Sequence, residues 1–323
     1  MIIVSEGKDS GKFSIYLEYG KLLDFFKIAN SITHDGRLQF EDFKMSVVEI
    51  NMHNTVGLQL IMYIPKIFEN TVSLKNLFGG TKKKYLVEFK DILNVLSSFN
   101  CESSDLIECK IDEINNIFVF LPRSSTDGYN RCGYVPICEN PITRRGSLEL
   151  IDDFVLKYME DYTFMQIDVN CAELQSAIKS ISDMEFNSWG EGVILMGTEK
   201  GLTVSSSTSK GELGAGNRLK TAYLSITIPF DGDMEYLKKD VFIGRKPEKE
   251  WVASLFEAEY FLNLLNILPK NCILTVSVAT NCVGMIETKM RGISLRYGIA
   301  PRYSDNANLI IEDAYAKWMM LRD

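Results

Sequence analysis

The chain has 323 residues, of which 46% are hydrophobic and 24% are charged, and its formal net charge at pH 7 is -8. This composition is typical of a folded globular protein rather than a disordered one, and the length allows roughly two domains. Because the surface as a whole repels phosphate, binding of nucleic acid would require a local basic face.

Several classes of protein are disfavoured by the same sequence. The longest apolar run covers residues 60–64, far short of the roughly 20 residues of a membrane-spanning helix, and the first residues do not resemble a signal peptide. The seven cysteines are scattered without a Cys-x-x-Cys pair, which favours reduced thiols. Two histidines, His34 and His53, are too few for a metal site built from several imidazoles. We therefore expect a soluble intracellular protein.

Strand patterns dominate the chain, and short helices interrupt them. Alternating or β-branched segments predict strands at residues 13–17, 37–40, 45–50, 56–64, 85–88, 106–111, 117–121, 165–169, 192–196, 202–206, 222–228, 251–256, 272–278, 283–288 and 293–299. Apolar residues at helical spacing predict four helices at 20–32, 89–99, 170–182 and 257–268. Each helix has one apolar face, the pattern of a helix that lies on a sheet. Asn170 is the expected N-cap of the third helix, with Glu173 completing a capping pair.

The order of these elements indicates one structural unit used twice. The strand and helix at 13–32 have a counterpart at 164–182, about 150 residues later, and the helix at 89–99 has one at 257–268. The segment between the halves is rich in charge and turn residues, as in a connector. The sequence thus predicts an N-terminal domain at 1–136, a connector at 137–163, a C-terminal domain at 164–303 and a tail at 304–323.

The tail and two long loops lie outside this repeat. Apolar residues of the tail recur at roughly helical spacing, at Ile310, Ile311, Ala314, Trp318 and Leu321. We expect the tail to pack on the protein's own surface, with docking of a partner as the alternative. Long loops are expected at 205–220 and 230–250. The glycine-rich stretch 211–218 lacks Gly-Lys-Ser/Thr and a following helix, so a mobile loop is favoured over a phosphate site.

Taken in order, these motifs resemble the sliding-clamp, or PCNA-like, family. The segment 256–303, which ends in RYGIAPRY, is similar to the family's closing helix, alternating strand, hairpin and final strand. Residues 41–69 resemble its early hairpin. The segments YIPKIFE, VEFKDILNVLSSF and DLIECKID resemble in particular the "rad-one" subunit of the heterotrimeric nine-one-one DNA-damage checkpoint clamp. The resemblance extends over about residues 12–303.

This resemblance implies an α+β DNA-clamp fold, with two similar domains that each pack two helices on antiparallel sheets. It implies a non-catalytic subunit, without a cofactor, of a heterotrimeric ring that encircles double-stranded DNA without sequence specificity. It also implies two other clamp subunits, an ATP-dependent clamp loader, checkpoint kinases and repair proteins as partners, and a nuclear location.

Two sets of residues are candidates for binding within such a clamp. Cations on the solvent faces of the helices would meet the DNA backbone, and the candidates are Lys21, Lys27, Lys90 and Lys179. The alternative is that they are ordinary solvated lysines of amphipathic helices. Clamp partners usually dock in a pocket beneath the connector, where the apolar candidates are Ile142, Leu148, Leu150 and Ile151. These four residues could instead pin the connector to the protein.

Two other functions compete with the clamp. Glu257 and Glu259 follow a predicted strand, and carboxylates at a strand end can hold the metal ions of a 3'-5' exonuclease. Further ligands would come from Asp112, Glu113, Asp152 and Asp153. Against this, acidic residues at the start of a helix favourably meet its dipole, and residues two apart on a helix diverge. The third function is a DNA-independent adaptor of repeated α+β domains.

Overall fold

The chain divides into two compact units in the computed structural model. The N-terminal unit comprises residues 1–51, 57–149 and 289–296, and the C-terminal unit comprises residues 52–56, 150–288 and 297–323. The structure describes residues 12–41, 44–50, 55–64, 83–123, 131–139, 164–185, 192–198, 200–206, 223–229, 242–243, 251–302 and 307–320.

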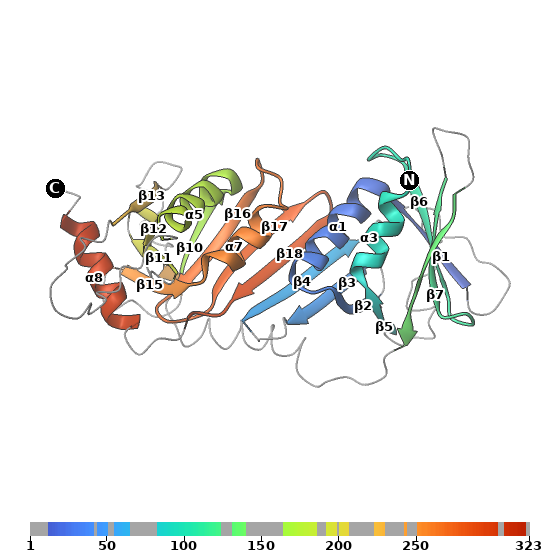
Figure 1. Cartoon of the computed structure of the whole chain (residues 1–323), viewed down its shortest axis with the longest axis horizontal. Helices are drawn as coiled ribbons and strands as arrows, with labels where there is room; N and C mark the ends of the chain where they lie inside the picture. The colour runs from blue at the N-terminus through green and yellow to red at the C-terminus, as the bar shows by residue number, and fades with distance from the viewer. Residues whose placement is uncertain are drawn as a thin grey trace. The chain divides into compact units, whose positions relative to one another are not determined.

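The N-terminal unit packs two helices against two antiparallel sheets (Figure 1). Its elements are β1 (Lys12–Glu18), α1 (Tyr19–Ile32), β2 (Asp35–Glu41), β3 (Lys44–Ile50), β4 (Val56–Tyr63), β5 (Lys83–Glu88), α3 (Phe89–Ser97), β6 (Leu106–Asp112), β7 (Ile117–Pro122), β8 (Gly133–Pro136) and β9 (Cys138–Glu139). One sheet has the strand order β1-β6-β7-β8, and the other strands follow the order β4-β3-β2-β5-β9.

The C-terminal unit is built in the same way and ends in an additional helix. Its elements are β10 (Phe164–Asn170), α5 (Cys171–Glu185), β11 (Val193–Thr198), β12 (Gly201–Ser206), β13 (Ser225–Pro229), β14 (Phe242–Ile243), β15 (Trp251–Phe256), α7 (Ala258–Leu265), β16 (Ile273–Ala279), β17 (Gly284–Met290), β18 (Ile293–Ile299) and α8 (Ala307–Met320). Residues 289–296, which end β17 and begin β18, are nevertheless grouped with the N-terminal unit. The strand orders are β14-β10-β16-β17-β18 and β13-β12-β11-β15. None of the helices described is both long and apolar enough to span a membrane.

Strand order confirms the internal repeat that the sequence predicts. The order β1-β6-β7-β8 corresponds to β10-β16-β17-β18, and β4-β3-β2-β5 corresponds to β13-β12-β11-β15. In each unit one helix directly follows the first strand, β1 or β10, and the second directly follows the corresponding strand of the other sheet, β5 or β15. The chain therefore contains two similar α+β units with antiparallel sheets, as expected. The boundaries of the predicted connector at 137–163 stay a prediction, because most of it lies outside the described residues.

Buried aromatic rings join the helices to each other and to their sheets. Phe25 and Phe26 of α1 are fully buried, and the ring of Phe26 lies 6.0 Å from that of Phe89 in α3. In the C-terminal unit the ring of Phe256 in β15 lies 5.5 Å from that of Phe261 in α7, edge to face. Burial of such side chains contributes about 1.5–3 kcal/mol each, so the apolar stripes detected in the sequence are the faces that attach each helix.

Local signals place the helix boundaries within a few residues of those expected. The N–H of Ala172 donates to Oδ1 of Asn170 over 2.9 Å, so the predicted N-cap of α5 is confirmed. Helix α5 continues to Glu185, three residues further than expected. Helices α3 and α7 end earlier, at Ser97 and Leu265, and the chain continues in turns that the periodicity alone did not separate from helix.

The tail forms α8, which packs on the C-terminal unit as expected. Ile311, Ala314 and Trp318 join a buried cluster with residues of β11 and β15, and the ring of Tyr315 stacks 4.7 Å from that of Trp251. Nε1 of Trp318 donates to Oγ1 of Thr227 in β13 over 3.3 Å. Helix α8 thus attaches to both β15 and β13.

Removal of the Trp318 side chain should detach α8. Trp318 is 8% exposed, so Trp318→Ala leaves a cavity and should lower the free energy of unfolding of this unit by about 3 kcal/mol. Hydrogen exchange should show faster exchange at amides of 307–320. Met320→Ala is the matched control on the same helix, because Met320 is 78% exposed. Equal exchange in the two variants would contradict the packing described.

Candidate nucleic-acid interface

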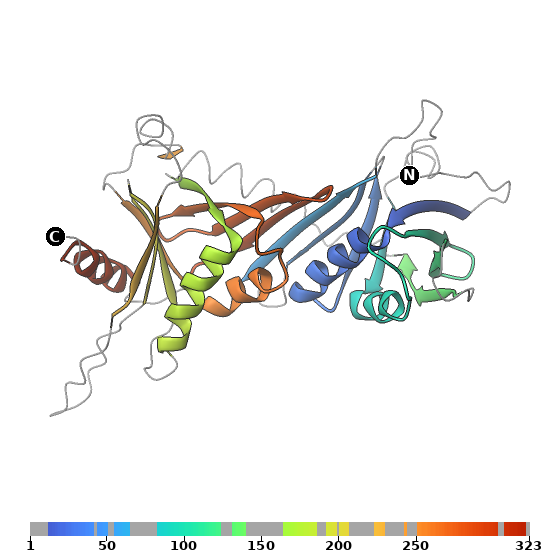
Figure 2. The ribbon, with the colours of Figure 1, turned by 90° about the horizontal axis from the view of Figure 1, so that it is seen from above.

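The two helices of each unit form the surface on which the candidate lysines lie. Helix α1 packs beside α3, and α5 packs beside α7 (Figure 2). Their buried residues include Leu22 in α1, Ile92 in α3, Ile178 in α5 and Leu264 in α7. The opposite faces carry mainly polar side chains. Each unit therefore presents one surface of paired helices.

Three of the four candidate lysines are exposed on these helices. Lys27 in α1, Lys90 in α3 and Lys179 in α5 are exposed. Lys21 is half-buried, and its Nζ lies 2.8 Å from Oε1 of Glu18. Such a pair at the surface contributes little to stability. Contact of these lysines with DNA stays a prediction.

Arg291 is a cation of this surface that the sequence analysis missed. It lies in the turn between β17 and β18, and its Nη1 is 3.3 Å from Oδ2 of Asp24 in α1. Asp24 lies between Lys21 and Lys27 in the sequence of that helix. The φ angles of Arg291 and Gly292 are 46° and 81°, as in a tight hairpin turn. Arg-Gly between two strand patterns signals the turn, but no sequence signal indicates which helix the turn contacts.

Lys270 is a second cation that was missed. Its Nζ donates to Oε1 of Gln175, and Nε2 of Gln175 donates to Oδ1 of Asn266 over 2.5 Å. Gln175 and Lys179 are four residues apart and therefore share a face of α5. Helix α7 itself contains no lysine or arginine. Lys270, which follows the end of α7, is the cation nearest to this helix in the sequence.

Acidic residues occupy the same helices and moderate their charge. The four helices contain Asp24, Asp91, Glu173, Asp183, Glu185 and Glu259. Asp91, Glu173 and Glu259 lie in first turns, where a negative charge favourably meets the helix dipole. These six carboxylates outnumber the four lysines of the helices, and Arg291 and Lys270 only bring the two numbers level, so the surface carries no net positive charge. Few net contacts with phosphate can be made, which favours weak and salt-sensitive binding.

The carboxylates of the competing nuclease have partners in the chain itself. Oε1 of Glu257 lies 3.9 Å from Nη1 of Arg302. Oδ1 of Asp112 accepts backbone N–H groups in the β6–β7 turn, and Oε1 of Glu113 accepts the hydroxyl of Tyr85 over 2.5 Å. Within the part of the chain that the structure describes, no three His, Cys, Asp or Glu side chains gather as metal ligands would. Glu257, Asp112 and Glu113 therefore each have a partner within the chain.

Other candidates cannot be placed. Outside the described residues lie the connector residues Ile142, Leu148, Leu150 and Ile151, the acidic pair Asp152 and Asp153, the stretch 211–218 and Leu321.

Strand β13 is an open edge among the described strands. It pairs with β12 and ends its sheet. The N–H of Ser206 donates to the carbonyl oxygen of Leu224 over 3.0 Å. Because antiparallel pairing alternates, the backbone polar groups of Ser225 and Thr227 point away from β12. Strand β9 likewise ends its sheet beyond β5. Unpaired edges are templates for pairing with another chain.

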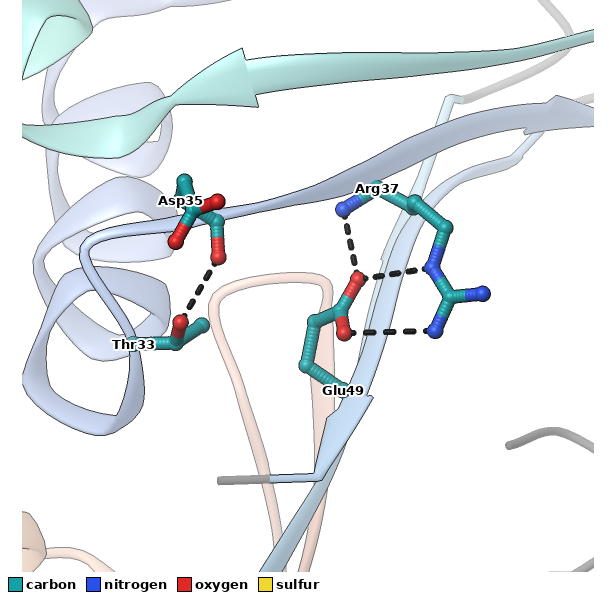
Figure 3. Close-up of polar contacts among 4 residues, drawn as sticks. All are labelled: Thr33, Asp35, Arg37 and Glu49. Atoms are coloured by element: carbon teal, nitrogen blue, oxygen red, sulfur yellow. Dashed lines mark hydrogen bonds and ion pairs between the residues drawn. The ribbon is translucent and has the colours of Figure 1, made fainter. Parts of the chain in front are cut away.

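A largely buried ion pair fixes the strand that follows α1 (Figure 3). Glu49 in β3 accepts the backbone N–H of Arg37 over 2.6 Å, and its two carboxylate oxygens lie 3.0 Å and 3.3 Å from Nε and Nη2 of that residue. The side chain of Glu49 is 13% exposed and that of Arg37 is 17% exposed. Oγ1 of Thr33 donates to the carbonyl oxygen of Asp35 over 2.7 Å in the preceding turn. These bonds join β2 to β3 and fix the turn that leads from α1 into β2.

The fold, but not the sequence, matches known proteins. No family model and no curated protein matches the sequence. The structure is similar to PCNA from Thermococcus kodakaraensis, with a TM-score of 0.62 and 12% identity over 90% of this chain and 99% of that chain. It is also similar to A. fulgidus PCNA in a structure with the C-terminal region of FEN-1 bound (TM-score 0.60, 14% identity) and to the PCNA2-PCNA3 complex from Sulfolobus tokodaii (0.60, 13%). Both likenesses again cover 90% of this chain and 99% of the other chain. The fold is the PCNA-like clamp fold.

The Arg37–Glu49 pair should contribute measurably to stability. Glu49→Gln removes the negative charge that lies 3.0 Å from Nε of Arg37 in a mostly buried site, and it should lower the free energy of unfolding by about 2 kcal/mol. Glu18→Gln removes the exposed ion pair with Lys21 and should cost less than about 0.5 kcal/mol. Urea denaturation followed by circular dichroism compares the two variants. The account is wrong if Glu18→Gln proves the more damaging change.

Proposed function

We propose that the protein is a non-catalytic subunit of a ring-shaped DNA clamp that encircles DNA at sites of damage. The observation that carries this proposal is the clamp fold itself, formed by two units with the same strand order and two helices each. Such a fold can bind DNA by enclosing it, so it needs no catalytic residues and no sequence-specific contacts. The assignment of Glu257, Asp112 and Glu113 to contacts within the chain supports a role other than that of a nuclease.

The ring would form by pairing of strand edges between subunits. At the open edge of β13, the backbone groups of Ser225 and Thr227 would pair with a strand of the next subunit. Strand β9, which lies at the end of the order β4-β3-β2-β5-β9, would provide the second edge. Two different neighbours are proposed, as in a heterotrimer. The similarity to a complex of PCNA2 with PCNA3 supports this arrangement, because that clamp combines different chains.

Contact with DNA would be electrostatic and weak. Lys27, Lys90 and Lys179 are exposed on helix surfaces, with Arg291 and Lys270 close to the same helices. The carboxylates of those helices outnumber their lysines, so the cations act as individual contacts and not as a basic surface. Binding would then rest on enclosure of the duplex, and the few phosphate contacts would allow the ring to slide.

The checkpoint role rests on the resemblance to the rad-one subunit of the nine-one-one clamp. The segments 87–99 and 105–112 that carry it form α3, β6 and their flanking residues. In this role the protein would act in the nucleus, be placed on DNA by an ATP-dependent loader and recruit checkpoint kinases and repair factors. The similarity to a clamp that binds a region of FEN-1 supports recruitment of such factors.

Assembly tests the ring directly. Co-expression with the two other subunits of the checkpoint clamp should give a 1:1:1 complex in light scattering. Ser225→Pro removes a backbone donor from the open edge of β13 and should weaken the complex at least about tenfold, because edge strands tolerate proline only when that donor is not needed. Ser225→Ala is the matched control, since it removes the same hydroxyl and keeps the N–H. A homotrimer would indicate a replication clamp, and a monomer in every combination would indicate an adaptor.

The lysines are tested by the salt dependence of DNA binding. The affinity of the assembled complex for a short duplex should fall steeply with salt. Lys27→Ala, Lys90→Ala and Lys179→Ala combined should reduce the log–log slope by about 0.9 for each phosphate that the complex no longer neutralises. Lys200→Ala is the control, because Lys200 is exposed in the β11–β12 turn and belongs to none of the four helices. An unchanged slope in the triple variant would remove these lysines from the interface.

A further inference from the structure

Two cysteines of the C-terminal unit lie opposite each other where β10 passes into α5. The antiparallel register pairs Asn170 with Ile273, so Cys171 and Cys272 are the next residues across from each other. The N–H of Cys171 donates to the carbonyl oxygen of Cys272 over 3.0 Å. Side chains of directly opposed residues point to the same side, with Cβ atoms about 4.5–5.5 Å apart. A disulfide needs about 3.5–4.5 Å, so a small movement would join them.

The two thiols interact and differ in access. Cys171 is buried and Cys272 is only partly buried. Burial is the main cause that raises the pKa of Cys171, to about 12, and the charge of Cys272 and the hydrogen bond between the two thiols add to it, while Lys270 opposes it. Burial also raises the pKa of Cys272, although the hydrogen bond with Cys171 acts to lower it. The more accessible sulfur is therefore also the one whose thiolate is stabilised by its neighbour.

We propose that Cys171 and Cys272 form a dithiol site that peroxide oxidises to a reversible disulfide. The Cys272 thiolate attacks one oxygen of hydrogen peroxide, the O–O bond breaks, and the departing hydroxide takes a proton to become water. Cys272 is then a sulfenic acid. The Cys171 sulfur, after losing its proton, attacks the Cys272 sulfur, the S–O bond breaks, and a second water leaves. The two thiols lose two electrons and two protons in total, and peroxide gains them.

The disulfide would tie the start of α5 to the segment that precedes β16. That segment includes Lys270, which contacts Gln175 of α5. The cross-link closes a loop of about 100 residues, which restricts the unfolded chain and should raise the Tm of this unit by roughly 5 °C or more. Reduced conditions inside cells keep such pairs open, so the site would respond to oxidation.

The test uses the full chain, reduced and then exposed to hydrogen peroxide. Digestion without reductant followed by mass spectrometry should find one cross-linked peptide pair containing Cys171 and Cys272, with two hydrogen atoms lost and restored by dithiothreitol. The initial rate should rise about tenfold per pH unit between pH 7 and 8, because the thiolate fraction does so below the pKa. The Tm of the oxidised chain should rise.

Serine variants test the roles assigned to Cys272 and Cys171. Cys272→Ser should abolish the cross-link, and Cys171→Ser should leave a sulfenic acid on Cys272 that dimedone traps. Cys282→Ser is the control, because Cys282 is buried elsewhere in the same unit, and it should keep the cross-link. If Cys171→Ser fails to fold, Cys272→Ser alone decides. The proposal is overturned if peroxide modifies the exposed Cys132 or Cys138 while the pair stays reduced, or if peroxide raises the Tm of Cys272→Ser as much as that of the unchanged chain.

Discussion

The structure depends on burial of one apolar face of each helix against antiparallel strands. Phe26 and Phe89 meet in the N-terminal unit, and Phe256 and Phe261 meet in the C-terminal unit. Because these contacts use only one side of each helix, the opposite side is left to carry lysines and carboxylates. The same packing that stabilises each unit therefore creates the surface proposed to face DNA.

Repetition of the unit has a second consequence at the strand edges. The inner strands of each unit pair within the chain, and β9 and β13 are among the described strands at sheet ends, together with β1, β8, β14 and β15. Helix α8 covers the sheet of β13 through Trp318 and Thr227 without pairing with the strand's edge. In a monomer an open strand edge promotes aggregation, whereas in a ring it can pair with the neighbouring subunit. The clamp fold and the edges thus support the same proposal.

Periodicity predicted the helices, the repeat and the packing of the tail, because apolar spacing reports directly on which face is buried. The sequence also predicted Asn170 as the N-cap of α5, because the capping hydrogen bond joins residues only two apart, Asn170 and Ala172. Arg291 could not be placed, because its contact with Asp24 joins residues 267 apart. The lysines alone did not predict the charge of the helix surface, because the same helices also contain acidic residues. Several of these lie in first turns, where a negative charge favourably meets the helix dipole.

The central claim is that the protein grips DNA by enclosing it rather than by adhesion. The most direct measurement loads the assembled complex onto a nicked circular plasmid with its ATP-dependent loader, isolates the DNA-bound fraction, and then cuts the plasmid once with a restriction enzyme. If the ring encloses the duplex, the protein should stay on the circle and be lost from the ends of the linear DNA. Equal retention on circular and linear DNA, or no retention on either, would contradict this claim.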